Sequence, residues 1–254
     1  MILTTDIGNT NITLGVFDGE ALTVTFRLAT QRHRTADQYA LELKALFVLH
    51  GLPDRLDGAV VSSVVPELTK ALCEAIRTVT GADPLVIGAG VKNGLKIVTD
   101  NPKELGADLV AGAVGAITKY PLPCLIMDLG TATKISLVDE GGVFRGCTIA
   151  PGIGISLDAL AGRTSQLPTV ALSAPTHVIG TNTPDAIRAG TVLGSAAMMD
   201  GMIDRFEREL GRKVASVIAT GGLSRDVAAC CEREVVLDPD LVLEGLLAIY
   251  HKNQ

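Results

Sequence analysis

The chain has 254 residues, which suits either one large domain or two domains of roughly 120 residues each. Hydrophobic residues make up 47% and charged residues 20%, a composition typical of soluble α/β proteins. The net charge of −6 argues against a protein that binds the phosphate backbone of DNA or RNA. No apolar stretch reaches the ~18 residues of a membrane span and no secretion leader is visible, so we expect a cytoplasmic protein without a membrane or nucleic-acid partner.

The cysteines and histidines form no disulfide or metal pattern. The cysteines are odd in number, and neither residue type has the spacing of a zinc site. Unpaired thiols in a reducing compartment are therefore expected for Cys73, Cys124, Cys147, Cys230 and Cys231.

The first half opens with alternating apolar runs that predict an antiparallel meander, with strands at residues 2–5, 11–17 and 21–28. A helix is expected over residues 35–49, with Thr35 as its N-cap and with Gly51 and Pro53 after its end. The chain then alternates strand and helix, which indicates buried parallel strands. The expected elements are strand 58–63, helix 66–80, strand 85–87 and helix 106–118.

The second half repeats this order, with strands expected at residues 122–127, 133–139 and 143–149 and a helix ending near residue 161. Residues 163–183 are polar and lack clear periodicity, and Pro184 opens a helix that runs to about residue 210. Strands at 214–219 and 235–237 and a helix over 240–250 follow. Because no linker separates the halves, we expect two lobes, 1–121 and 122–254, that share a cleft.

The two halves each carry an acidic, small-residue turn directly after an apolar run: Asp6-Ile7-Gly8-Asn9-Thr10 and Asp128-Leu129-Gly130-Thr131-Ala132-Thr133. Such a hairpin exposes backbone N–H groups and hydroxyls with little bulk, so an anionic group can lie close against it. The carboxylate would repel a bare phosphate, which indicates a metal ion between the two. A duplicated hairpin of this kind predicts a protein that holds a metal-bound polyphosphate from both sides.

The chain resembles the type III pantothenate kinases, a family within the actin, sugar-kinase and chaperone-ATPase superfamily. The matching motifs, in chain order, are Asp6 to Asn11, Val61 to Pro66, Asn101-Pro102, Gly106-Ala107-Asp108, Asp128 to Thr133, Ile149 with Pro151-Gly152-Ile153, Leu167-Pro168, Ile179-Gly180 with Asn182-Thr183, and Ala219 to Leu223. The resemblance covers the whole length. It implies an α/β fold of two duplicated ribonuclease-H-like lobes, the actin-like ATPase fold, with mixed sheets flanked by helices.

The resemblance also implies an activity: ATP-dependent phosphorylation of the primary hydroxyl of pantothenate, the first step of coenzyme A biosynthesis. The cofactors would be ATP with Mg²⁺ and a monovalent cation, K⁺ or NH₄⁺. Asp108 would be the general base, Asp6 would face Mg²⁺ through a water molecule, and Asp128 would ligate the monovalent cation. The ATP contacts would come from Asp6, Ile7, Gly8, Asn9, Thr10, Asn11, Ile12, Thr13, Thr131, Gly221 and Gly222. The acceptor contacts would come from Thr99, Gly106, Ala107, Asp108, Leu109 and Thr183.

The departures from the family pattern gather around the acceptor. Leu109 stands where the family usually has an Arg that contacts the pantothenate carboxylate, and Thr99 stands in place of a Tyr. Lys134 replaces a Thr, and the usual Gly and Thr around Ile149 are Cys147 and Ala150. Either a nearby cation, Lys134 or Lys103, compensates for the missing Arg, or the acceptor is a different small hydroxy acid.

Simpler explanations remain for these residues. Asp6 and Asp128 are also common turn residues, and Asp108 and Thr183 are also N-cap candidates. The alternative functions are a nucleotide-binding regulator or accessory factor with lost turnover, and a phosphatase or polyphosphate hydrolase of the same superfamily. The family resemblance further implies a homodimer, for which the Gly- and Ala-rich helix over residues 186–206 would suit close packing, with the partner helping to close the acceptor pocket.

Overall fold

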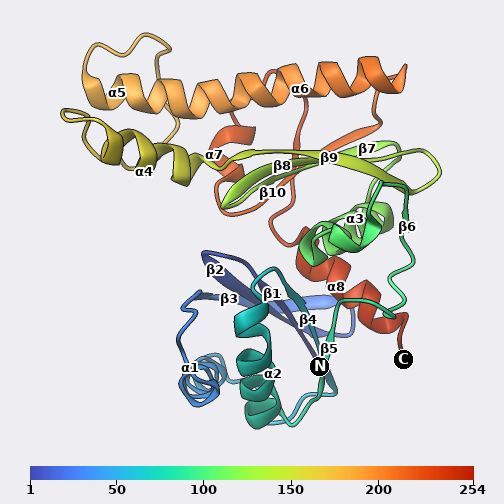
Figure 1. The fold of residues 1–254 in the computed structure, drawn as a ribbon. Helices are drawn as coiled ribbons and strands as arrows, with labels where there is room; N and C mark the ends of the chain where they lie inside the picture. The colour runs from blue at the N-terminus through green and yellow to red at the C-terminus, as the bar shows by residue number, and fades with distance from the viewer. The chain divides into compact units, whose positions relative to one another are not determined.

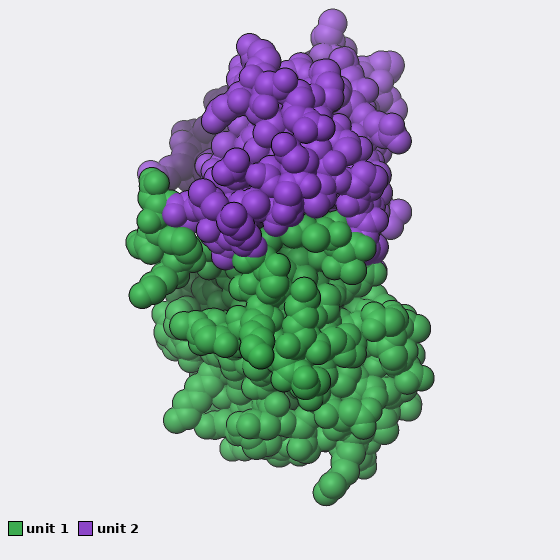
Figure 2. All heavy atoms as spheres, turned by 90° about the vertical axis from the view of Figure 1, so that its right-hand side faces the viewer, with its two compact units in different colours: residues 1–95, 100–118, 241–254 green, residues 96–99, 119–240 purple.

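The computed structural model describes all residues, 1–254, and is an α/β protein. The chain forms two compact units, coloured separately in Figure 2. Unit 1 comprises residues 1–95, 100–118 and 241–254, and unit 2 comprises residues 96–99 and 119–240. This division departs in three segments from the continuous lobes, 1–121 and 122–254, expected from the sequence. Residues 96–99 and 119–121 belong to unit 2, and residues 241–254, which include the C-terminal helix, belong to unit 1.

Unit 1 is built on a five-stranded mixed sheet with the order β3-β2-β1-β4-β5. Its strands are β1 (Ile2–Ile7), β2 (Asn11–Asp18), β3 (Ala21–Ala29), β4 (Gly58–Ser63) and β5 (Pro84–Val86). The first three form the expected antiparallel meander, and β4 runs parallel to β1. The register of that parallel pair places Asp6 beside Ser62, so two polar side chains meet where both strands end.

Helices α1 (Ala36–Leu49) and α2 (Pro66–Thr80) lie side by side against one face of this sheet (Figure 1). Thr35 is the N-cap of α1, as expected, and forms a capping box with Gln38. Tyr39 of α1 and Leu72 of α2 are fully buried in the core between the helices and the sheet.

The opposite face of the sheet of unit 1 is covered by α8 (Leu241–His251). A Cβ built on Gly15 of β2 would lie 3.0 Å from Leu243, and one built on Gly58 of β4 would collide with Tyr250. Helix α8 also packs closely on α3 (Ala107–Lys119), because a Cβ on Gly245 would collide with the backbone. These close approaches, to Gly15 and Gly58 of the sheet and to the backbone of α3, explain why the last helix belongs to unit 1.

Unit 2 repeats the plan of unit 1 in a six-stranded sheet with the order β11-β10-β7-β8-β9-β6. Its strands are β6 (Lys96–Ile97), β7 (Cys124–Leu129), β8 (Ala132–Val138), β9 (Val143–Pro151), β10 (Ser216–Thr220) and β11 (Val236–Leu237). The meander β7-β8-β9 corresponds to β1-β2-β3, and β10 runs parallel to β7 as β4 does to β1. The predicted duplication is therefore present in the strand pairing itself.

The helices of unit 2 are α4 (Ile153–Arg163), α5 (Thr183–Arg188), the π-helix Ala189–Leu193, α6 (Gly194–Leu210) and α7 (Ser224–Ala228). The π-helix joins α5 to α6, so the single helix expected after Pro184 is present with one local change of winding. It lies along one face of the sheet (Figure 1), where Met199 and Ile203 are fully buried. The N-cap of α5 is Asn182, whose side chain accepts from the N–H of Asp185, and not Thr183, which is the first helical residue. No helix of the protein is both long and apolar enough to span a bilayer.

Candidate active site

The hairpin of unit 1 is a tight turn that only glycine fits at one position. The N–H of Gly8 donates to the carbonyl of Asn11 at 3.0 Å, and a Cβ on Gly8 would lie 2.9 Å from the same oxygen. Thr30 of the loop after β3 secures the turn, because its Oγ1 donates to the carbonyl of Gly8 at 2.6 Å. The turn between β1 and β2 is thus fixed by one backbone hydrogen bond and by the hydroxyl of Thr30. The side chain of Asp6 takes part in neither of these bonds and is oriented separately.

Asp6 is oriented by the end of β4. The hydroxyl of Ser62 donates to Oδ1 of Asp6 at 2.9 Å. The structure contains no cluster of three His, Cys, Asp or Glu side chains that could hold a metal ion by themselves. A single carboxylate nevertheless fits Mg²⁺ of a nucleotide, because that ion keeps several waters and is bound by one or two carboxylates together with substrate phosphates. Asp6 is the residue of unit 1 that would hold Mg²⁺, and the ion would offset phosphate charge there.

Asp108 lies in the first turn of α3, and its Oδ1 accepts the N–H of Leu109 at 2.8 Å. A Cβ on Gly106 would lie 2.5 Å from Oδ1 of Asp108 and 3.7 Å from Val64, which follows β4. Val64 in turn donates its N–H to the carbonyl of Ile7 at 3.1 Å. The start of α3 therefore lies close to the ends of β1, which carries Asp6, and of β4.

The hairpin of unit 2 is enclosed by a second glycine turn. The N–H of Gly152, after β9, donates to the carbonyl of Thr131 at 3.1 Å. A Cβ on Gly152 would collide with the carbonyl oxygens of Gly130 and Thr131. The Pro151-Gly152 turn therefore packs directly against the hairpin, a contact that the sequence motifs alone do not predict.

The Thr220-Gly221-Gly222 turn lies on the other side of Asp128. Thr220 pairs with Asp128 in the parallel register of β10 and β7. Gly221 has a φ of +92°, which disfavours other residues, and a Cβ there would lie 2.7 Å from Oδ1 of Asp128. Two sequence motifs, Asp128 to Thr133 and Ala219 to Leu223, are thereby brought together within unit 2. The family resemblance implied ATP contacts for Thr131 and Gly221 and the monovalent-cation ligand for Asp128.

The second carboxylate oxygen of Asp128 is engaged by Lys134. The two residues face each other across β7 and β8, and Nζ of Lys134 lies 2.7 Å from Oδ2 of Asp128. A K⁺ or NH₄⁺ ion bound to this oxygen would be repelled by the ammonium of Lys134, which already occupies that position. The residues around Asp128 thus do not fit the monovalent-cation site implied by the family resemblance. Lys134 is one of the two cations that the sequence offers to the acceptor carboxylate in place of the missing Arg, and the structure pairs it with Asp128 instead.

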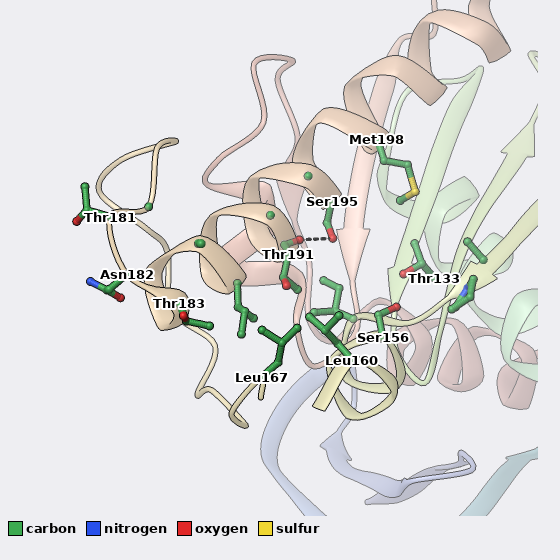
Figure 3. A pocket seen from close by; sticks show the side chains of 18 residues that line it. Thr133, Ser156, Leu160, Leu167, Thr181, Asn182, Thr183, Thr191, Ser195 and Met198 are labelled. Atoms are coloured by element: carbon green, nitrogen blue, oxygen red, sulfur yellow. Dashed lines mark hydrogen bonds between the residues drawn. The ribbon is translucent and has the colours of Figure 1, made fainter. Parts of the chain in front are cut away.

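A pocket of about 1020 Å³ opens in unit 2 between α4 and the helix α5–α6 (Figure 3). Thr133 lies at its sheet end and Thr183 at the start of α5, and no lining residue carries a charge. The polar lining groups belong to Thr133, Ser156, Thr181, Asn182, Thr183, Thr191 and Ser195.

Of the acceptor residues expected from the sequence, Thr183 is the one that lines this pocket. Thr99 follows β6 in unit 2, and its Oγ1 is buried without a hydrogen-bond partner. Residues 106–109, which include Leu109, lie in unit 1. The expected acceptor residues are therefore distributed over both units.

The family model for type III pantothenate kinases matches residues 2–205. A type III pantothenate kinase from Exiguobacterium sp. strain AT1b is 43% identical over 255 aligned residues, which cover 100% of both chains. The chain belongs to the type III pantothenate kinase family. In this family member, the motifs that the structure brings together at Asp128 are among those by which the sequence resembles the family.

The fold of this type III pantothenate kinase family member is shared by distant solved structures. A protein described as a Baf family transcriptional activator from Campylobacter jejuni superposes with a TM-score of 0.60 at 19% identity, covering 99% of this chain and 98% of the other. A ROK family glucokinase from Streptomyces griseus, in complex with glucose and AMPPNP, gives 0.51 at 15% identity, covering 98% of each chain. These likenesses concern the fold alone, and they confirm the predicted actin-like ATPase and sugar-kinase architecture.

Proposed function

We propose that this protein transfers the γ-phosphoryl group of ATP to the primary hydroxyl of pantothenate, the first step of coenzyme A biosynthesis. The observation that carries the proposal is its 43% identity, over the full length of both chains, to a type III pantothenate kinase. Membership of this family makes the protein a phosphotransferase with an alcohol group as acceptor.

ATP with Mg²⁺ is the proposed phosphoryl donor. In unit 1, the turn residues 6–13 bind phosphate through backbone N–H groups and hydroxyls, and Asp6 binds Mg²⁺ through water. In unit 2, Thr131 contacts phosphate, and Gly221 and Gly222 let the nucleoside lie against the backbone. Support for this assignment comes from the hydrogen bond of Ser62 to Asp6 and from the packing of Gly221 against Asp128, since both orient carboxylates at the ends of hairpin strands.

Asp108 is the proposed general base. Phosphoryl transfer needs charge neutralisation and in-line positioning, while a carboxylate takes the proton of the attacking hydroxyl. Asp108 lies at the start of α3, and Val64 and Ile7 link this segment to the strand that carries Asp6. The hydrogen bond from Leu109 fixes one carboxylate oxygen and with it the rotamer of the side chain.

Lys103 is the proposed partner of the pantothenate carboxylate in place of the Arg that Leu109 replaces. Lys134 is held by Asp128, whereas Lys103 is exposed on the short 3₁₀ helix Pro102–Glu104 that precedes α3. Thr99, Thr183 and the turn Gly106-Ala107 complete the proposed acceptor contacts. The pocket beside Thr183 offers hydroxyl and amide groups for the polar middle of pantothenate.

The protein is proposed to act as a homodimer through unit 2. The helix α5–α6 exposes Gly190, Gly194 and Met198, and large apolar side chains are exposed near it on α4 and the loop before α5. These are Ile155, Leu160, Val178 and Ile179. A second copy would cover them. Sedimentation of wild type and of Met198→Glu tests this, and a monomeric wild type would contradict it.

Cytoplasmic residence is proposed from the cysteines and the substrate. All five cysteines are free thiols, which is typical of proteins in a reducing compartment. The proposed phosphoryl donor, ATP, is also available in the cytoplasm.

A kinase for a different hydroxy compound is the second candidate. Two observations favour it: Leu109 is apolar, and the pocket beside Thr183 has no charged lining residue. Neither supplies the positive charge that would pair with the carboxylate of pantothenate. A coupled ADP-release assay with Mg-ATP, with pantothenate and with hydroxy compounds lacking the carboxylate, separates the two. Release that depends on pantothenate supports the first function. Release with an uncharged acceptor alone supports the second, and release without any acceptor indicates a hydrolase.

A further inference from the structure

Asp128 and Lys134 form a cross-strand ion pair next to the turn of the hairpin of unit 2. The strands β7 and β8 place the two residues directly opposite each other, and the ammonium lies 2.7 Å from Oδ2. Both side chains are shielded, with 21% of the Asp128 side chain and 15% of the Lys134 side chain exposed. The other oxygen, Oδ1, lies against Gly221. The carboxylate is therefore held between a fixed cation and a backbone turn.

A carboxylate beside bound phosphates needs a cation, because two anions in a shielded site repel each other strongly. The resemblance described above implies that an external K⁺ or NH₄⁺ meets this need where position 134 is Thr, since a hydroxyl carries no charge. Lysine brings a compact ammonium with one positive charge on a flexible stem, and it binds phosphate as a point charge in P-loops. In this chain the positive charge beside Asp128 therefore comes from the side chain of Lys134, on the strand β8 that follows the turn.

We propose that the ammonium of Lys134 replaces the monovalent cation at Asp128, so that this protein binds ATP and transfers its phosphoryl group without K⁺ or NH₄⁺. The inference rests on the proposed ATP site in unit 2. It assigns Lys134 as a residue that positions Asp128 and neutralises its charge beside the phosphates. A lysine that instead served the acceptor carboxylate would affect pantothenate and leave nucleotide binding unchanged.

The test uses the full-length protein and measures the affinity for Mg-AMPPNP by calorimetry, without acceptor. Titrations in choline chloride, KCl and NH₄Cl at equal ionic strength are compared for wild type, Lys134→Thr and Lys134→Gln. The matched control is Arg145→Thr, which removes another short ion pair, 2.8 Å from Nε to Oδ2 of Asp139, at the far end of the same β8–β9 hairpin. Tl⁺ resonance spectra report directly on binding of a K⁺-like ion.

Wild type and Arg145→Thr should bind Mg-AMPPNP equally well in all three salts and should not retain Tl⁺. Lys134→Thr should lose about 10- to 150-fold in affinity in choline chloride, the range for a charged hydrogen bond, and should regain most of it in KCl or NH₄Cl. Lys134→Gln, which keeps the length of the side chain, should show the same dependence if the Thr variant does not fold.

A wild type whose nucleotide affinity rises tenfold or more with K⁺, or that holds Tl⁺, would overturn the inference. A Lys134→Thr protein that binds nucleotide equally well in choline and potassium salts would also overturn it, as would a change confined to pantothenate affinity. Absence of Mg-AMPPNP binding by wild type in every salt would instead overturn the proposed ATP site, and this inference with it.

Discussion

Oδ1 of Asp128 lies so close to Gly221 that a Cβ on the glycine would be 2.7 Å from it. This contact joins the hairpin of unit 2 to the turn after β10, two motifs that are far apart in the sequence. The same glycine has a φ of +92°, so its backbone conformation and its packing both exclude a larger residue.

Gly221→Ala should therefore weaken binding of Mg-AMPPNP by about 5- to 150-fold, because a side chain at positive φ costs about 1 to 3 kcal/mol and would also displace Asp128. Calorimetric titration measures the loss. Gly162→Ala is the matched control, since a Cβ on that helical glycine meets no atom within 4 Å. Equal affinities for the two variants would remove Gly221 from the nucleotide site.

Asp108→Asn should lower the rate of phosphoryl transfer by about 10²- to 10⁴-fold while leaving the affinity for Mg-AMPPNP unchanged, because the amide keeps the shape of the side chain but cannot take a proton. Single-turnover kinetics and calorimetry measure the two quantities. A transfer rate like that of wild type would show that Asp108 only stabilises the first turn of α3.

The duplication could be predicted from the sequence because each copy is marked by a short motif of neighbouring residues. Each half has an apolar strand that ends in Asp, then a small-residue turn, and the strands pair in the same order in both units. The start of α1 is determined in the same way, because the two residues of its capping box, Thr35 and Gln38, are three positions apart in the sequence. Features of this kind depend on spacing alone.

The close packing of distant segments was not predictable in the same way. Residues 240–250 are predicted from the sequence as a last helix of the second half, yet α8 packs in unit 1 because glycines at positions 15, 58 and 115 leave room for it. The ion pair of Asp128 and Lys134 was not predicted either, because it depends on the register in which β7 and β8 pair. A count of alternating residues on both sides of the hairpin would have placed the two opposite each other.

Leu109→Arg should raise the affinity for pantothenate by about 10- to 150-fold if pantothenate is the acceptor, because a charged hydrogen bond contributes about 1.5 to 3 kcal/mol. The KM for pantothenate measures the effect, with the KM for ATP as the internal control. Lys103→Ala should raise the KM for pantothenate in the otherwise native protein. If neither substitution changes it, the carboxylate is bound elsewhere or the acceptor lacks one.

The stability of unit 2 should depend on pH through Glu207 of α6. Its side chain is buried, which works to raise its pKa, but hydrogen bonds from Arg233, Lys213 and the N–H of Val214 outweigh burial and lower the pKa from 4.5 to about 2. A carboxyl whose pKa is lower in the folded state contributes stability above its unfolded pKa. That contribution is lost as the pH falls from about 4.5 to about 2.

Glu207→Gln should therefore lower the free energy of unfolding at neutral pH by about 1.5 to 3 kcal/mol and flatten its pH dependence below pH 4.5. Urea denaturation at several pH values measures both effects. Glu140→Gln is the control, because its ion pair with Arg212 is 3.5 Å long and exposed, and such pairs contribute about 0 to 1 kcal/mol. An acid-unfolding profile of Glu207→Gln that parallels wild type would contradict the assignment.

The most direct test of the proposed activity is phosphorus NMR of the protein incubated with Mg-ATP and pantothenate. We predict the appearance of a phosphate monoester on the primary hydroxyl of pantothenate in an amount equal to the ADP formed, with no build-up of inorganic phosphate. Inorganic phosphate as the product, or an ATP signal that persists whether or not pantothenate is present, would contradict the account.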